Sequence, residues 1–361
     1  MEIMPDFDAS DINRLLTALS HRESDRVPHM ENWVTSAAVY EYVLERKLAY
    51  DVQDARVGGL SVTPEDYVEF AGRLGMDAVL CNLSWRPCNV FTAASDGSEH
   101  YVDGTVKSWA ALDDLEPPLP IEEQFAYMER FIKAAEGTGV GIVTNFTSFF
   151  DSAMLAIGVN DSFLMFYDDR PLVEKLMDIL LEHQEKVARE IFDRYGDHIA
   201  YCMVNDDIGH NNGLMISPDM FLDIFPRRME RLLAPAKEQG KLCLMHTDGK
   251  MDNIIPILRD VGIDAVHPVE PESNDIVEVK KQWAGKMALM GNIPTVLLAY
   301  GTADEVETMV RDYCVRLGPG GGWVLGSSTS IMEGVKPENF VAMTRAVHKY
   351  GRYGTLGMET T

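Results

Sequence analysis

His246 and Asp248 stand two residues apart at the end of an apolar run, KLCLMH (241–246). In an extended segment, side chains two residues apart point the same way, so both can reach one ligand. Imidazole nitrogen and carboxylate oxygen both bind zinc, and three protein ligands with an open position are typical of catalytic zinc. Glu270, which ends the run DAVHPVE (264–270), is the third candidate. The pattern therefore predicts a catalytic metal site of His246, Asp248 and Glu270. The alternative is a His–Asp hydrogen bond in which Asp248 caps the next helix.

The elements that must position these residues are short apolar runs that alternate with amphipathic segments. Most runs lack strict polar alternation, which is typical of parallel strands covered on both faces. Eight such runs indicate an α/β fold, a (β/α)8 TIM barrel. A doubly wound open sheet is the alternative, although no GxGxxG follows the first run. The runs span residues 26–33, 77–83, 141–146, 199–206, 241–246, 264–270, 287–292 and 322–328.

Two long segments between these runs carry clear helix signals. Residues 217–240 open with Ser217-Pro218, a cap followed by Pro at the first helical position, and end at a glycine. Residues 170–196 have apolar residues at three- and four-residue spacing. No linker rich in Gly, Ser or Pro divides the chain, so we expect one domain over residues 1–361. Residues 84–125 are turn-rich and predict an excursion after strand two that covers the active site.

In such barrels the functional residues lie at the carboxyl ends of the strands. Here nearly every predicted strand ends in a polar residue that can coordinate or hydrogen-bond. Any one of them could simply cap a helix, but eight ends that meet at one mouth predict a site. Asp206 and Asp207 are adjacent and face opposite ways on a strand, so we expect one of them to be structural. The predicted substrate-binding residues are Glu31, Asn82, Asn145, Asp207, His210, Asn292 and Ser328.

Composition excludes some classes of partner. Lys and Arg number 32 against 57 Asp and Glu, a formal charge of -25, and nucleic-acid binding needs a basic surface. The first residues lack a basic segment followed by an apolar run, and no apolar stretch reaches the length of a membrane span. The five cysteines are scattered, without a CxxC. We therefore expect a cytoplasmic protein that binds neither nucleic acid nor membrane.

Several motifs carry a family resemblance. The chain resembles the uroporphyrinogen decarboxylase superfamily and, within it, the cobalamin (corrinoid)-dependent methyltransferase branch. The resemblance implies a barrel and a corrinoid carried by a partner protein, and it favours a homodimer. The motifs are HRESDRVP (21–28), NDDIGHNNGLMISPDMFLDIFPRRMERL (205–232), MHTDGKMDNIIPILRDVGIDAVHPVEP (245–271), GNIPTVLLAYGTADEVE (291–307) and GWVLGSSTSIMEGVKPENFVAM (322–343).

The sequence departs from the patterns of two branches of that superfamily. The decarboxylases have an arginine-rich segment after the first strand, where this chain has HMENWVTS (29–36), and an Asp after the second, where it has Asn82. The branch that methylates a thiol holds zinc through His-x-Cys and a further Cys, and a Glu can fill a fourth position. The resemblance places His246, Asp248, Thr329 and Glu270 at those positions, so both sulfur ligands are replaced.

An oxygen and nitrogen ligand set changes the chemistry that zinc supports. Thiolates suit activation of a thiol, whereas harder ligands leave zinc more electrophilic and able to act as a Lewis acid. We therefore expect a methyltransferase that moves methyl from a small donor to the Co(I) corrinoid of a partner protein. An O-methyl donor such as a methoxylated aromatic is favoured. Trp33, Trp85 and Phe149 could line an aromatic pocket or serve the core.

Three other functions stay open. One is a metal-independent decarboxylase-like enzyme, which would need no corrinoid. Another is a methylcobamide:thiol methyltransferase with altered ligands. The third is a non-catalytic binding barrel, for which loss of His246 would change no activity.

Overall fold

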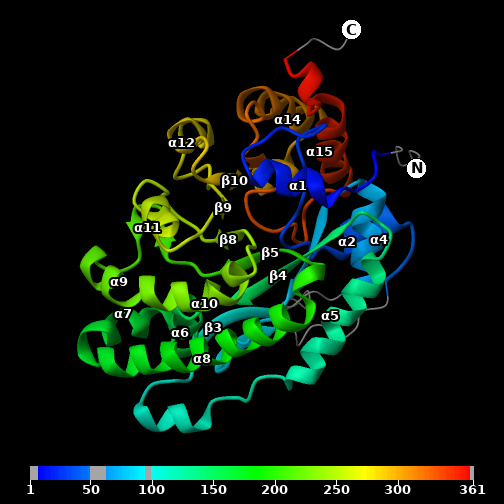
Figure 1. Cartoon of the computed structure of the whole chain (residues 1–361). Coiled ribbons are helices and arrows are strands. Elements are labelled where there is room, and N and C mark those ends of the chain that lie inside the picture. Colours follow the sequence, from blue (N-terminus) through cyan, green and yellow to red (C-terminus); the bar gives the residue numbers. More distant parts are fainter. Residues whose placement is uncertain (1–6, 49–61, 94–98, 358–361) are drawn as a thin grey trace.

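The centre of the molecule is a curled, parallel, seven-stranded sheet. The computed structural model describes residues 7–48, 62–93 and 99–357 (Figure 1). The strands follow the order β1-β4-β5-β8-β9-β10-β11, and all neighbours pair in parallel. Each of them falls within or beside a predicted apolar run. Their bounds are β1 Ala78–Asn82, β4 Gly141–Thr147, β5 Ile199–Asn205, β8 Cys243–His246, β9 Ala265–His267, β10 Ala288–Met290 and β11 Trp323–Val324.

Residues 28–30 close this sheet into a ring. The amide of Leu325 donates to the Pro28 carbonyl at 2.9 Å, and the amide of Met30 donates to the Leu325 carbonyl at 3.1 Å. On the other side, the amide of Asp77 donates to the His29 carbonyl at 2.9 Å. The segment thus lies between β11 and β1 as the eighth member, and the predicted (β/α)8 barrel is confirmed. Its pairing is limited to single bridges, and Pro28 has no amide to contribute.

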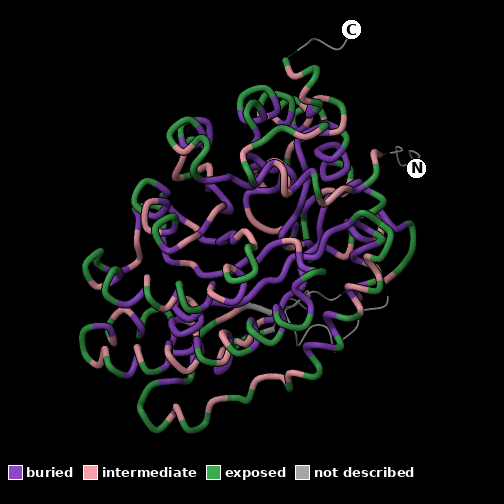
Figure 2. Tube along the Cα trace, in the orientation of Figure 1, coloured by how far each residue is buried: buried purple, intermediate pink, exposed green. Residues whose placement is uncertain are grey.

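Helices surround the barrel, and Figure 2 shows buried strands inside helices whose outer faces are exposed. The predicted helix at 170–196 is α8, which begins after the N-cap Asp169. The predicted helix at 217–240 is instead two helices, α9 and α10, because Pro226 restricts the preceding residue and starts a new helix. The helices are α1 Ile12–Leu19, α2 Ala37–Leu44, α4 Pro64–Leu74, α5 Ile121–Ala135, α6 Phe150–Ile157, α7 Val159–Asp168, α8 Arg170–Tyr195, α9 Pro218–Ile224, α10 Pro226–Glu238, α11 Ile254–Asp260, α12 Ile276–Trp283, α13 Thr295–Tyr300, α14 Ala303–Leu317 and α15 Pro337–Tyr350, with 3-10 turns η1 Trp109–Asp114, η2 Gly196–His198 and η3 Tyr353–Thr355.

The predicted excursion after strand two is present. It contains an antiparallel hairpin, β2 Asn89–Ala93 and β3 Glu99–Gly104, followed by η1. The amide of Val106 donates to the Ala156 carbonyl at 2.9 Å, so the excursion rests on the end of α6. A shorter hairpin, β6 Gly209–His210 and β7 Gly213–Leu214, follows β5. Across the described ranges, none of the helices combines the length and apolarity needed to traverse a bilayer.

Candidate metal centre

Three side chains meet where β5 and β8 end. Asp207, His246 and Asp248 each offer a ligand atom, and these atoms lie within 4.8 Å of one another. The Nε2 atom of His246 is 3.8 Å from Oδ1 of Asp207. We call these three residues the mouth cluster. It lies at the carboxyl end of the barrel strands, where the sequence placed a metal.

Backbone pairing brings the two chain segments of the mouth cluster together. Asn205 of β5 is in register with His246 of β8. Just beyond, the amide of Asp206 donates to the His246 carbonyl at 3.0 Å, and the amide of Asp248 donates to Oδ1 of Asp207 at 3.3 Å. Asp207 therefore faces the cluster as a consequence of strand register, which side-chain spacing alone does not reveal.

Gly249 allows the turn after β8 to pack against the β6 hairpin. Its φ is 108°, a left-handed conformation that disfavours other residues. A Cβ added there would lie 2.6 Å from the backbone nitrogen of His210. A side chain at this position would push the turn, and Asp248 with it, away from Asp207.

Glu270 lies beside the cluster rather than within it. Its Oε2 accepts a hydrogen bond from the amide of Gly249 at 2.7 Å. Among the described residues, the group of close ligand atoms includes Asp207 and not Glu270. Glu270 still acts on the cluster electrostatically, since its charge helps to raise the pKa of Asp248. Of the three predicted ligands, the structure brings His246 and Asp248 together, with Asp207 as the third member.

The carboxyl groups at the mouth hold protons more tightly than ordinary carboxyls. Burial, together with the charges of Asp207, Glu270 and Asp151, raises the pKa of Asp248 to about 7. Burial also raises the pKa of Asp207. The guanidinium of Arg86 opposes the shift of Asp207 and forms an ion pair with Asp151 at 3.2 Å. Such crowding of like charges favours the neutral forms unless a cation joins them.

His246 is a neutral imidazole in this setting. Burial, together with the charge of Arg86, lowers its pKa to about 3. The ring of Trp33 stands edge-on to it, with centroids 4.7 Å apart. On its other side, Nδ1 lies 2.8 Å from Nδ1 of His267. One neutral imidazole and two carboxylates are a donor set that fits zinc with positions left for a substrate, so the residues present fit the predicted metal.

Asp206, the neighbour of Asp207, is the structural member of the pair. Its Oδ1 accepts from the amide of Asp151 at 2.6 Å, at the start of α6. Burial raises the pKa of this carboxyl to about 8. The expectation that one of the two adjacent aspartates is structural thus fits the geometry, with Asp207 turned to the cluster.

The predicted substrate-binding residues are distributed around the barrel wall. Glu31 contacts Ser327, the amide of Asn145 donates to Asn82 at 2.7 Å, and Asn292 donates to the Val269 carbonyl. Oγ of Ser328 accepts from the amide of Thr295 at 3.3 Å. His210 is exposed, and its Nδ1 accepts from the amide of Asn211. Apart from Asp207, the structure does not bring these residues into the cluster, and substrate binding by them stays a prediction.

The three aromatic candidates do not form one pocket. Trp33 contacts His246. Trp85 packs against His183, and Phe149 is fully buried against Phe225. Only the first of the three has a ring contact with the mouth cluster.

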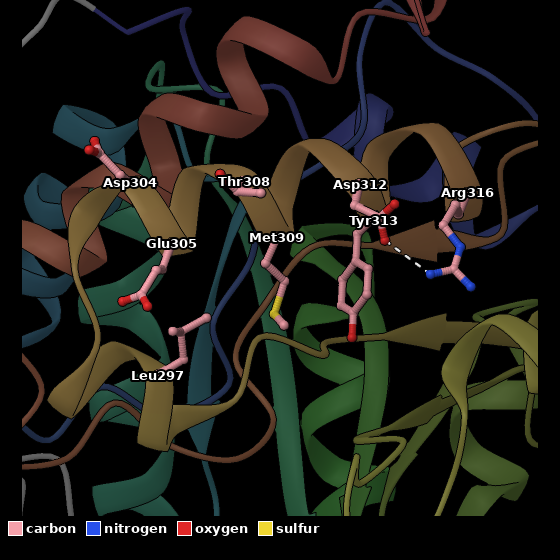
Figure 3. A pocket seen from close by; sticks show the side chains of 8 residues that line it. All are labelled: Leu297, Asp304, Glu305, Thr308, Met309, Asp312, Tyr313 and Arg316. Atoms are coloured by element: carbon pink, nitrogen blue, oxygen red, sulfur yellow. Dashed lines mark hydrogen bonds and ion pairs between the residues drawn. The ribbon is translucent and has the colours of Figure 1, made fainter.

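A separate groove of about 670 Å³ lies along α14 and is lined by residues of α13 and α14 alone (Figure 3). Leu297, Met309 and Tyr313 form its apolar part, and Asp312 pairs with Arg316 at its edge. None of these residues belongs to the mouth cluster, and no feature of the groove indicates what it holds.

Comparisons with known proteins agree with this architecture. Residues 91–350 match the family model described as "Uroporphyrinogen decarboxylase (URO-D)". The chain therefore combines a barrel that has a candidate metal centre at its carboxyl end with a family match over most of its length. The chain belongs to the uroporphyrinogen decarboxylase family.

Among solved structures, a methyltransferase from Methanosarcina mazei superposes with a TM-score of 0.71 at 17% identity, covering 95% of this chain and 99% of that one. This likeness shows the fold. A glycoside hydrolase has a TM-score of 0.48 at 8% identity, covering 89% of this chain and 99% of that one. Dispersin B has a TM-score of 0.43 at 14% identity, covering 82% and 96%. A comparison with curated proteins finds no match.

Proposed function

We propose that this protein is a methyltransferase that moves a methyl group from a small O-methylated donor to the Co(I) corrinoid of a partner protein. A methoxylated aromatic is the favoured donor. The observation that carries the proposal is the mouth cluster, which offers one neutral imidazole and two carboxylates at the end of the barrel where such enzymes react. In this proposal Asp207, His246 and Asp248 hold zinc, and Glu270 supports them from outside.

The residues of the cluster suit an oxygen leaving group. Zinc held by oxygen and nitrogen ligands supplies Lewis-acid chemistry that favours departure of the donor oxygen with its bonding electron pair. Asp207 and Asp248 provide the negative charge that retains the cation. Trp33 packs edge-on against the His246 ring. The family resemblance and the fold shared with a methyltransferase support the reaction class.

The same residues weaken the alternatives. A decarboxylase of this family acts on a substrate with many carboxylates, and Asp151, Asp207, Asp248 and Glu270 would repel it. A thiol methyltransferase with zinc held through cysteines lacks its sulfur ligands here, because Asp248 stands at one of the two positions. Sequence resemblance places Thr329 at the other.

Polar atoms in the barrel wall support a substrate with neutral hydrogen-bonding groups. Asn32 is fully buried, and neither of its side-chain polar atoms has a partner among the described residues. Oδ1 of Asn145 and Oδ1 of Asn292 are likewise buried without a hydrogen-bond partner among the described residues. Buried amides without partners are costly, so a bound ligand that satisfies them would gain affinity.

The test is methyl transfer to reduced cobalamin from a methoxylated phenol, which is neutral near pH 7, followed by absorbance, with zinc measured in the same preparation. Wild-type protein should contain zinc and transfer methyl, and His246→Ala should lose both. His198→Ala is the matched control, because His198 is exposed in η2 at the opposite end of β5. Equal transfer by His246→Ala and wild type would refute the proposal. Turnover of a carboxylated substrate without corrinoid would favour the decarboxylase.

A further inference from the structure

The imidazole rings of His246 and His267 face each other at the ends of the neighbouring strands β8 and β9. The two residues are in register, and their Nδ1 atoms lie 2.8 Å apart. Both rings are buried. Two nitrogens at this distance share one proton, so one Nδ1 donates and the other accepts.

The backbone carbonyl of Ser327 decides which nitrogen donates. Nε2 of His267 lies 3.3 Å from this oxygen, and a carbonyl can only accept. Nε2 of His267 therefore carries a proton. A buried imidazole without a carboxylate partner is neutral and has one proton, so Nδ1 of His267 is bare and accepts from Nδ1 of His246. The lone pair of His246 is then on Nε2, the atom 3.8 Å from Asp207.

Glu31 holds the carbonyl of Ser327 in place. The amide of Ser327 donates to Oε1 of Glu31 at 2.9 Å, and Oγ of Ser327 is 2.6 Å from Oε2. Oγ of Ser327 is also 3.0 Å from the Thr329 carbonyl. A protonated Glu31 can donate to Oγ of Ser327, whose own hydrogen then goes to Thr329. A buried network in which each member is satisfied is rigid.

We propose that His267 is a positioning residue that fixes the tautomer of His246 and so presents the bare Nε2 atom to Asp207 and Asp248. The ordered chain runs from Glu31 through Ser327 and His267 to His246. The part of this inference that concerns metal binding rests on the proposed function. The tautomer itself is a property of the protein without metal, so the two can be tested separately.

The first measurement is the ¹⁵N spectrum of histidine-labelled, metal-free wild-type protein near neutral pH. The His246 signals are assigned by their absence in His246→Ala. Nδ1 of His246 should be protonated and Nε2 bare, with the opposite pattern in His267. A proton on Nε2 of His246 would overturn the inference, and this result depends on no variant at position 267.

The second measurement compares His267→Asn with His267→Leu, which have similar shapes. Asn places an acceptor oxygen near the former Nδ1, and Leu places none there. Zinc affinity should fall about 10–100-fold in His267→Leu, the usual effect of losing a partner of a metal-bound histidine, and should be largely restored in His267→Asn. In His267→Leu the ¹⁵N spectrum should show both tautomers of His246.

The outcomes separate the two proposals. If His267→Leu keeps the wild-type tautomer and zinc affinity, the positioning role of His267 is refuted. If wild type shows the expected tautomer but binds no zinc, the tautomer assignment is supported and the proposed metal function fails.

Discussion

Carboxylates are buried at both ends of the barrel, but their partners differ. At the base, Asp77 precedes β1 and forms ion pairs with Arg14 and Arg26, and it accepts from the amide of His29 at 3.1 Å. Arg14 also contacts Asp25 at 2.7 Å. At the mouth, Asp207 and Asp248 lie next to each other.

The pKa values show the consequence. At the half-exposed Asp25, partial burial is outweighed by hydrogen bonding to Arg14 and by its charge, which lower the pKa to about 2. At the fully buried Asp77, burial outweighs the charges of Arg26 and Arg14, and the pKa is raised. Burial and neighbouring carboxylates raise the pKa of Asp248 to about 7. The chain supplies counter-charges at the base, where they stabilise the fold. The mouth is left with excess negative charge that suits an external cation.

The largest effect is expected at the base, from Asp77→Asn. This change leaves the buried Arg14 and Arg26 with less counter-charge, and breaking a buried pair costs about 3–5 kcal/mol. Urea unfolding measures the loss. Asp312→Asn, which removes an exposed pair with Arg316, is the control and should cost less than about 1 kcal/mol. An equal loss in both variants would refute the difference between buried and exposed pairs.

The next effect is at the mouth, from Asp248→Asn. Zinc affinity should fall by at least about 100-fold, because an amide carries no charge and is a poor zinc ligand. This loss exceeds the loss of about 10–100-fold in affinity that is usual for residues that contact a metal ligand and not the metal itself. Metal-free stability should not fall, because the change relieves repulsion from Asp207 and Glu270. Competition with a chelator measures the affinity. Asp25→Asn is the control, and equal zinc affinity in all three proteins would exclude the cluster as the metal site.

Glu31 at the mouth and Asp25 at the base should also differ in how pH affects stability. Burial raises the pKa of Glu31 from 4.5 to about 8, so the folded state binds more protons than the unfolded state between these values. Wild type should therefore lose stability relative to Glu31→Gln as pH rises through this window, by at most about 1.4 kcal/mol per pH unit.

Asp25 should show the opposite slope. Its pKa is lowered from 3.8 to about 2, so its contribution is present above 3.8 and is lost as pH falls to about 2. Over this pH range the free energy of unfolding of wild type should fall toward that of Asp25→Asn. Urea unfolding at a series of pH values tests both slopes, and the same sign for both would contradict the comparison.

The smallest effect is expected from Glu270→Gln. Zinc affinity should fall less than about tenfold, because the amide oxygen can still accept from the amide of Gly249 and only the charge is lost. Chelator competition again measures it. A loss as large as that of Asp248→Asn would restore Glu270 as a ligand, as the sequence alone predicts.

Part of this protein could be predicted from local patterns. Each barrel strand is a short apolar run, and burial of such runs in a parallel sheet depends on composition that the sequence displays directly. His246 and Asp248 could be paired because they belong to one strand end and share its alternation. The proline at 226 is visible in the sequence, yet the apolar spacing across it suggests one helix where there are two.

The sequence by itself determined the barrel, its polar mouth and the His246–Asp248 pair, because these follow from residue types and short-range spacing. Only the tertiary structure decided that Asp207 joins the cluster, that Glu270 bonds instead to Gly249, and that His267 faces His246. These relations depend on the register between strands and on the turn at Gly249. Both are set by the packing of segments far apart in the chain, which no local spacing records.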